Sequence, residues 1–194
     1  MSRQRLYDEN LVRQNIMALF HQKSFSDTSL ADLEVRTGLN RRQLYNNFGD
    51  KTQMFLSALR DFATGADKAF LSPLRQGDLG LSDIKTVFTV LTDMADQDQG
   101  RFGCLMCNTA RDPIMQQAPV AEIVNQFFDQ IKRSYEAALQ RAQTLDEVSM
   151  QHNIDKLATF YMGIHVSICV LGRAEVSSDT LRTIASESLK KLAN

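Results

Sequence analysis

Apolar residues recur at three- and four-residue intervals along almost the whole chain of 194 residues. Near the N-terminus, Val12, Ile16, Leu19 and Phe20 fall on one face of a helix with about 3.6 residues per turn. Only 9 glycines and 3 prolines interrupt the chain, and its one β-branched run, 164–170, lies inside a longer helical pattern. The sequence therefore predicts an all-α fold of about nine helices and argues against a turn-rich β architecture.

Capping residues and helix breakers mark where these helices begin and end. Asp8, Ser29, Asn40 and Asp50 each precede a helical pattern and can cap its first turn. The expected helices span residues 9–22, 30–37, 41–48, 50–75, 82–96, 103–111, 119–142, 148–172 and 179–192. Residues 76–80 contain two glycines and indicate a domain boundary. We thus expect a small domain over residues 1–52, a connecting fourth helix over 50–75, and a second domain over 76–194.

The charge of the chain is unevenly distributed between these parts. Residues 1–60 carry nine Lys/Arg and six Asp/Glu, whereas the rest of the chain has a net charge of -4. The first 20 residues are charged throughout, no window of about 20 residues is apolar enough to span a bilayer, and three cysteines do not make a secreted disulfide framework. These features predict a cytoplasmic protein with no membrane partner, and the basic N-terminal segment requires an explanation.

Residues 28–51 supply that explanation. Two helices of about eight residues are joined by a tight turn at Gly38, and apolar side chains of both would face the first helix. This is the layout of a helix-turn-helix, whose second helix enters the major groove of double-stranded DNA. The exposed positions of that helix hold Arg41, Arg42, Gln43, Asn46 and Asn47. Because Arg pairs with guanine, and Asn or Gln with adenine, the motif predicts sequence-specific DNA binding. A helical hairpin with an ordinary solvated face is the alternative.

The same segment resembles the N-terminal signature of the tetracycline-repressor (TetR) family of bacterial regulators. The matching residues are Thr28-Ser29, Asp32-Leu33, Gly38-Leu39-Asn40, Leu44-Tyr45, Phe48 and Lys51. The resemblance implies phosphate contacts for Thr28, Ser29, Tyr45 and Lys51, and base contacts at or near Arg41, Arg42 and Gln43. The full expected set is Thr28, Ser29, Asn40, Arg41, Arg42, Gln43, Tyr45, Asn46, Asn47 and Lys51. Glu34 departs from the family pattern, which has Ala there, so its carboxylate must reach solvent or strain the motif.

Residues 61–194 fit the divergent effector-binding and dimerisation domain of that family. The segment 102–110 resembles a G-C-L-x-x-N-x-A stretch that, in one branch, opens a helix beside the ligand pocket. Together with a stripe of polar-tipped residues on helix 148–172, it gives the candidate ligand-binding residues Phe102, Cys104, Cys107, Asn108, Tyr161 and His165. Two long helices, 119–142 and 148–172, have apolar faces too wide for one short C-terminal helix to cover. The resemblance implies a homodimer that binds an unknown small-molecule effector.

The cysteine pair leaves alternatives open. Cys104 and Cys107 form a C-x-x-C pair, and Arg101, Arg111 and a helix N-terminus could lower the pKa of Cys104. A thiol-based redox or electrophile sensor, or a dithiol oxidoreductase, would use this pair; a sequence-neutral architectural DNA binder is a third alternative. The chain has no nucleotide-binding or nucleophile-elbow motif, and its histidines are scattered. The leading prediction is a ligand-released repressor that binds a pseudo-palindromic operator as a dimer, without catalytic residues, metal or cofactor.

Overall fold

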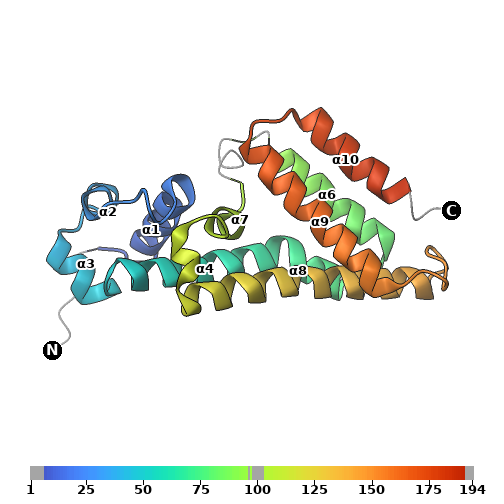
Figure 1. The fold of residues 1–194 in the computed structure, drawn as a ribbon, viewed down its shortest axis with the longest axis horizontal. Coiled ribbons are helices and arrows are strands. Elements are labelled where there is room, and N and C mark those ends of the chain that lie inside the picture. The colour runs from blue at the N-terminus through green and yellow to red at the C-terminus, as the bar shows by residue number, and fades with distance from the viewer. Residues whose placement is uncertain (1–6, 96, 98–102, 191–194) are drawn as a thin grey trace.

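The computed structural model describes residues 7–95, 97 and 103–190 (Figure 1). Every regular element in these ranges is helical, so the all-α prediction is confirmed for them. The elements are α1 (Glu9–Lys23), α2 (Leu30–Thr37), α3 (Arg41–Phe48), α4 (Lys51–Ala66), the π-helical turn η1 (Asp67–Leu71), α5 (Ser72–Gln76), α6 (Leu81–Ala95), α7 (Leu105–Thr109), the 3-10 turn η3 (Pro113–Gln116), α8 (Ala118–Thr144), α9 (Ile154–Arg173) and α10 (Ser178–Lys190).

Side-chain caps define the first four helices, as the sequence predicts. Asp8 accepts hydrogen bonds from the backbone N–H groups of residues 10 and 11 at the start of α1. Ser29, Asn40 and Asp50 each form a reciprocal capping box with the residue three positions later. A helix of eight residues is marginal on its own, so these caps and the packing of one apolar face are what keep α2 and α3 helical.

The helices form one elongated body with a continuous hydrophobic core. In Figure 1, α2 and α3 lie at one end, α6, α9 and α10 lie at the other, and α4 and α8 run between them. Phe20 of α1 packs edge-on against Phe55 of α4, with ring centroids 4.9 Å apart. In the larger part of the core, the ring centroids of Phe88, Tyr135 and Tyr161 are 5.9 Å from one another. Burial of these aromatic side chains is a major source of stability.

The connecting helix differs from the single α-helix expected over residues 50–75. It is α-helical to Ala66, passes through the π turn Asp67–Leu71, and continues as α5 to Gln76. Asp67 accepts hydrogen bonds from Arg75 at 2.7 Å and from Gln130 of α8 at 2.6 Å. The π turn is thus tied to α8, and it leaves Leu71 and Leu74 fully buried.

Two boundaries in the second half also differ from expectation. Helix α9 begins at Ile154 rather than at residue 148, because Asn153 caps it by accepting the backbone N–H of Lys156 at 3.0 Å. The expected helix over 103–111 shortens to Leu105–Thr109, because Asp112 caps a separate 3-10 turn that starts at Pro113. The expected ends at residues 96, 191 and 192 lie outside the described residues.

Helix α9 has more apolar surface than the chain itself covers. An 18-residue window of α9 has a mean hydropathy of 1.4, and only 22% of it is buried within the chain. By length and composition alone this helix meets the criterion for a membrane span, contrary to the sequence-based expectation that no segment does. Its inner side packs against α6, α8 and α10.

Candidate nucleic-acid interface and buried core

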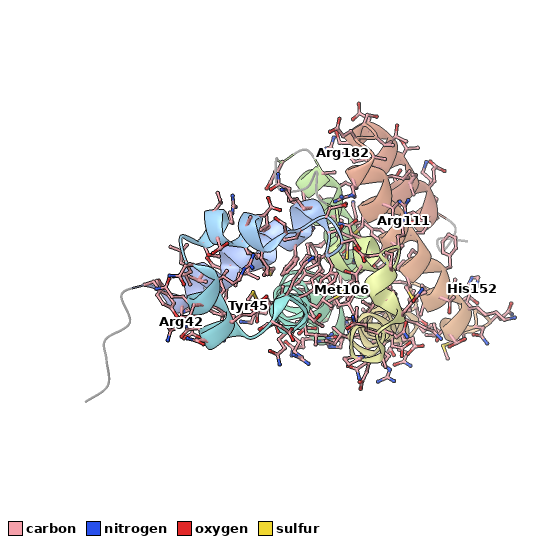
Figure 2. The ribbon with its side chains drawn as sticks, turned by 60° about the vertical axis from the view of Figure 1, so that its left-hand side comes forward. Arg42, Tyr45, Met106, Arg111, His152 and Arg182 are labelled. Atoms are coloured by element: carbon pink, nitrogen blue, oxygen red, sulfur yellow. The ribbon has the colours of Figure 1, made fainter. Side chains whose placement is uncertain are left out.

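Helix α3 presents a polar, basic face at one end of the molecule. Leu44 is fully buried and anchors the helix, whereas the side chains of Arg41, Arg42, Gln43, Tyr45, Asn46 and Asn47 are exposed. Figure 2 shows Arg42 at the outer end of the molecule, while Met106 of α7 lies in its body. A short helix held from behind and exposed in front has the geometry that major-groove insertion requires.

The exposed side chains of α3 divide into two groups. Gln43 accepts the backbone N–H of Asn40 at 3.0 Å through its side-chain oxygen, and Asn47 donates to the carbonyl of Gln43 at 2.6 Å. These amides hold the helix in shape. Among the described residues, Arg41, Arg42 and Asn46 make no such bond within the helix, so their donors and acceptors face outward. They are therefore the side chains best placed to meet base edges.

The residues expected at phosphates lie along the edges of this face. Ser29 is exposed at the start of α2, where its hydroxyl donates to Asp32 at 2.7 Å. The ammonium of Lys51 lies 4.2 Å from the centroid of the Phe25 ring, and burial lowers the pKa of Lys51. Thr28 is buried, and its hydroxyl donates to the Ser24 carbonyl at 2.6 Å. In this structure the Thr28 side chain thus shapes the α1–α2 connection.

Glu34 caps the recognition helix from outside. Its carboxylate accepts the backbone N–H of Arg41, the first residue of α3, at 2.7 Å. The bond lies at the surface and Glu34 is half-buried, so the carboxylate reaches solvent, which was one of the two outcomes expected from the sequence. It also satisfies one of the free N–H groups at the N-terminus of α3. Sequence spacing did not signal this bond, because it joins two different helices across the turn.

The candidate ligand-binding residues that the structure describes lie in one half of the buried core. Cys104 and Cys107 are buried at the start of α7 and within it, and His165 is buried on α9. Tyr135 of α8 and His165 are hydrogen bonded, with Oη and Nδ1 3.1 Å apart, and Tyr161 donates to the Ser188 carbonyl at 2.9 Å. Asn108 is partly buried on α7, and Phe102 lies outside the described residues.

Two further residues, absent from the candidate ligand-binding set, lie against these side chains. Cys169 of α9 lies beside Cys104, and Tyr135 comes from α8. The spacing of Cys169 from His165 on one helix face was a signal for the first of these. Nothing in the sequence pairs Tyr135 with His165. We call Cys104, Cys107, Tyr135, His165 and Cys169 the core cluster.

Within the core cluster, His165 and Tyr135 carry no charge near neutral pH. Burial lowers the pKa of His165 to about 4 and raises that of Tyr135 well above its usual value. Hydrogen bonds with the thiols of Cys107 and Cys169 lower the pKa of Cys104, and the bond to Cys104 together with burial raises the pKa of each of those two. Neighbouring thiols thus act on Cys104, and Arg101, one of the two arginines expected to do so, lies outside the described residues.

Two hollows are lined by residues other than the core cluster and have volumes of about 170 and 200 Å³. The first is lined by α1, α3 and α4, including Arg13 and Arg60, and the second lies between α6 and α10, including Phe88 and Arg182. Within the described residues, no group of three His, Cys, Asp or Glu side chains is placed to hold a metal ion.

The fold and the exposed face of α3 define a helix-turn-helix DNA-binding protein with a larger helical body. Comparison with known families agrees. Residues 14–58 match the model of bacterial regulatory proteins of the tetR family, and residues 80–186 match that of the tetracyclin repressor-like C-terminal domain. The second model alone spans more than half of the chain. The chain belongs to the tetracycline repressor family and is a transcriptional regulator with a helix-turn-helix DNA-binding domain and a C-terminal ligand-binding domain.

Individual relatives are similar over nearly the whole length. The uncharacterized HTH-type transcriptional regulator YezE of Bacillus subtilis (strain 168) is 23% identical over 193 residues, which cover 99% of this chain and 100% of that protein. The HTH-type transcriptional repressor ComR of Escherichia coli (strain K12) is 23% identical, over 97% of this chain and 90% of that protein. A cysteine mutant of the regulator CifR, solved with a 26-base-pair operator DNA, has a TM-score of 0.87 at 19% identity, over 97% and 98% of the two chains.

Proposed function

We propose that the protein is a ligand-released repressor that binds a pseudo-palindromic operator as a homodimer. The observation that carries the proposal is the capped helix α3, which turns Arg41, Arg42 and Asn46 outward at one end of the molecule. The relative ComR is named a repressor, and the similar CifR structure contains operator DNA, which supports the proposal. Residues 1–52 would form the DNA-binding domain, α4 to α5 the connection, and residues 76–194 the effector-binding and dimerisation domain.

The apolar outer face of α9 supports the dimer. Phe160, Gly163, Ser167 and Val170 recur on this face at alternating three- and four-residue spacing, which suits packing against a second helix. A Cβ added at Gly163 would meet no atom within 4 Å, so the face is open there. A two-fold dimer would place two copies of α3 in successive major grooves of a pseudo-palindrome.

The core cluster is the proposed effector site. Its apolar surroundings and uncharged tyrosine and histidine suit an apolar or aromatic molecule with a hydrogen-bonding group. The likeness of residues 103–110 to a segment beside the ligand pocket in one family branch supports the same place. Binding would favour a conformer with differently spaced recognition helices, and a coupling of about 1–3 kcal/mol changes operator affinity about 5- to 150-fold.

The alternatives based on thiols have less support. The comparisons identify transcriptional regulators and do not favour a redox-sensing reading. Regulators of this family are generally non-enzymatic, and we propose the same for this chain, together with a cytoplasmic location and no cofactor. The negative net charge of the body disfavours a sequence-neutral architectural role.

Selection of bound duplexes from a random pool tests the proposal. Purified protein should enrich a pseudo-palindromic motif, and Arg41→Ala and Arg42→Ala should each weaken binding to it by about tenfold or more. Arg133→Ala, which removes an exposed arginine from α8, is the matched control and should bind like wild type. Recovery of no motif at low salt would contradict the proposal.

A further inference from the structure

Asp112 ends the stretch 103–112 around α7, here called the α7 segment, which also contains Cys104 and Cys107 of the core cluster. Its main partner, however, lies in the connection between α1 and α2. Its carboxylate accepts the backbone N–H of Ser26 at 2.9 Å and the hydroxyl of Ser26 at 2.8 Å. The same carboxylate accepts the N–H of Ile114 at 3.0 Å and so caps the 3-10 turn. Asp112 is 7% exposed. One buried carboxylate therefore joins two segments that are 86 positions apart in the sequence.

Ser26 belongs to the tight connection that leads into the helix-turn-helix. At its start, Ser24 ends α1 with a φ of 75° and accepts the hydroxyl of Thr28 through its carbonyl. At its end, Ser29 caps α2. The connection is only five residues long, from Ser24 to Thr28, so a shift of Ser26 is passed on to the first turn of α2. That turn lies on the proposed phosphate-contacting edge.

Asp112 also acts on Lys51, a second residue at the proposed phosphate-contacting edge. Its ammonium stacks on Phe25, the neighbour of Ser26. Burial lowers the pKa of Lys51, and the negative charge of Asp112 is the largest influence in the opposite direction. Burial also raises the pKa of Asp112, but hydrogen bonds from Ile114 and Ser26 outweigh it and keep that pKa below its usual value. The carboxylate is therefore charged at neutral pH. It binds Ser26 by hydrogen bonds and favours the charged form of Lys51.

The other end of the α7 segment is fixed as well. His21 of α1 donates through Nε2 to the carbonyl of Gly103 at 2.8 Å. A Cβ at Gly103 would come within 2.9 Å of the Cys169 carbonyl, so this loop lies directly on α9 beside the core cluster. Between the two ends, Leu105, Met106 and Thr109 are buried. Residues 103–112 thus touch the core cluster on one side and the DNA-binding helices at two points on the other.

We propose that Asp112 is a positioning residue for DNA binding: it holds the α1–α2 connection through Ser26 and so sets the phosphate-contacting edge of the helix-turn-helix from the effector side of the molecule. The inference rests on the proposed function for the identity of that edge. It goes beyond the proposal by naming the residue through which movement at the core cluster reaches the edge.

The charge of Asp112 allows a positioning role to be distinguished from electrostatic repulsion of DNA. If Asp112 acted on DNA only as a nearby negative charge, Asp112→Asn would raise operator affinity, because one source of repulsion from the phosphates is removed. As a positioning residue, Asp112→Asn lowers affinity by about tenfold at a temperature where the variant is folded. Asp93→Asn is the matched control, since Asp93 lies on α6 and pairs with Arg182 at 3.1 Å on the surface. It should leave affinity unchanged.

Hydrogen exchange supplies a readout that needs no DNA. We expect Asp112→Asn, and more weakly Ser26→Ala, which keeps the backbone N–H bond to Asp112, to speed amide exchange in residues 24–48 but not in α6 or α10. Exchange and affinity equal to wild type in folded Asp112→Asn would overturn the inference, and so would higher affinity without faster exchange. If wild type selects no operator, the proposed function fails, while faster exchange confined to residues 24–48 still supports the positioning role.

Discussion

His165 is a histidine that the fold keeps in its neutral form. In an unfolded chain its pKa is about 6.5, and burial lowers it to about 4 in the folded protein. As the pH falls, the unfolded state therefore binds the proton first. The contribution of neutral His165 to the free energy of unfolding is complete above about pH 6.5 and is lost between there and about pH 4. We expect the free energy of unfolding to fall by about 2 kcal/mol between pH 7.5 and 5, measured by urea denaturation at one protein concentration.

The pH dependence of the free energy of unfolding should come from His165 itself. His165→Gln should unfold with a flatter pH profile over this range, even if its stability at pH 7.5 is lower. His152, in the loop before α9, is the matched histidine, and His152→Gln should keep the slope of wild type. An unchanged slope in His165→Gln would show that the acid sensitivity comes from other groups.

Glu34 makes opposite contributions to folding and to DNA binding. Glu34→Ala removes the acceptor of the Arg41 N–H, so we expect a loss of about 1 kcal/mol in stability. The same change removes a negative charge beside Arg41, so operator affinity should rise at low salt. Glu34→Gln keeps an acceptor oxygen without the charge and should raise affinity while retaining most of the stability. Thermal unfolding and fluorescence-anisotropy titrations measure the two effects, and a fall in affinity for both variants would contradict this view.

At the scale of elements, the docking of the α7 segment onto α9 depends on Gly103. This residue has a φ of 65°, and an added Cβ would meet the Cys169 carbonyl at 2.9 Å. We expect Gly103→Ala to cost about 2–4 kcal/mol in thermal unfolding, from backbone strain and from the contact. Gly38 has a similar φ of 71° but no atom within 4 Å of such a Cβ, so Gly38→Ala should cost only about 1 kcal/mol. Equal losses would mean that the contact with α9 adds nothing.

Elements whose ends are set by nearby residues could be predicted from the sequence. The caps at Asp8, Ser29, Asn40 and Asp50 placed the first four helices to within a residue at their starts, because each cap bonds to a backbone only two or three positions away. The start of α9 at Ile154 is set by a cap of the same kind at Asn153, which the predicted start at residue 148 overlooked. The π turn in the connecting helix could not be predicted in this way, because Asp67 is bonded to Gln130 of α8 and periodicity within one segment does not contain that contact.

In the candidate sites too, residues on one helix could be predicted from the sequence, whereas contacts between helices could not. The exposed face of α3 was predictable, since one short helix carries all of it. The core cluster joins α7, α8 and α9, so only its members on a single helix, such as His165 and Cys169, could be associated beforehand. The bonds of Glu34 to Arg41 and of Asp112 to Ser26 are tertiary contacts, and no spacing in the sequence indicates them.

At the scale of the whole molecule, the proposed dimer concerns the outer face of α9. We expect Phe160→Arg to convert the protein to a monomer in sedimentation experiments, because it places a charge on an apolar face. Operator affinity should fall with it, since one recognition helix binds alone. Val35→Arg is the matched control, because Val35 is a more exposed apolar residue on α2, at the other end of the molecule. A dimer that survives Phe160→Arg would place the interface elsewhere.

The π turn has a consequence for how the two ends of the connecting helix are oriented about its axis. Leu59 and Leu71 are twelve positions apart, and in an uninterrupted α-helix they would point about 120° away from each other. If the π turn takes up one residue, that difference falls to about 20°, and both side chains reach the same core. Removing one residue from 67–71 would therefore keep both ends in phase. Removing one from 51–66 would rotate the DNA-binding end by about 100° relative to the body.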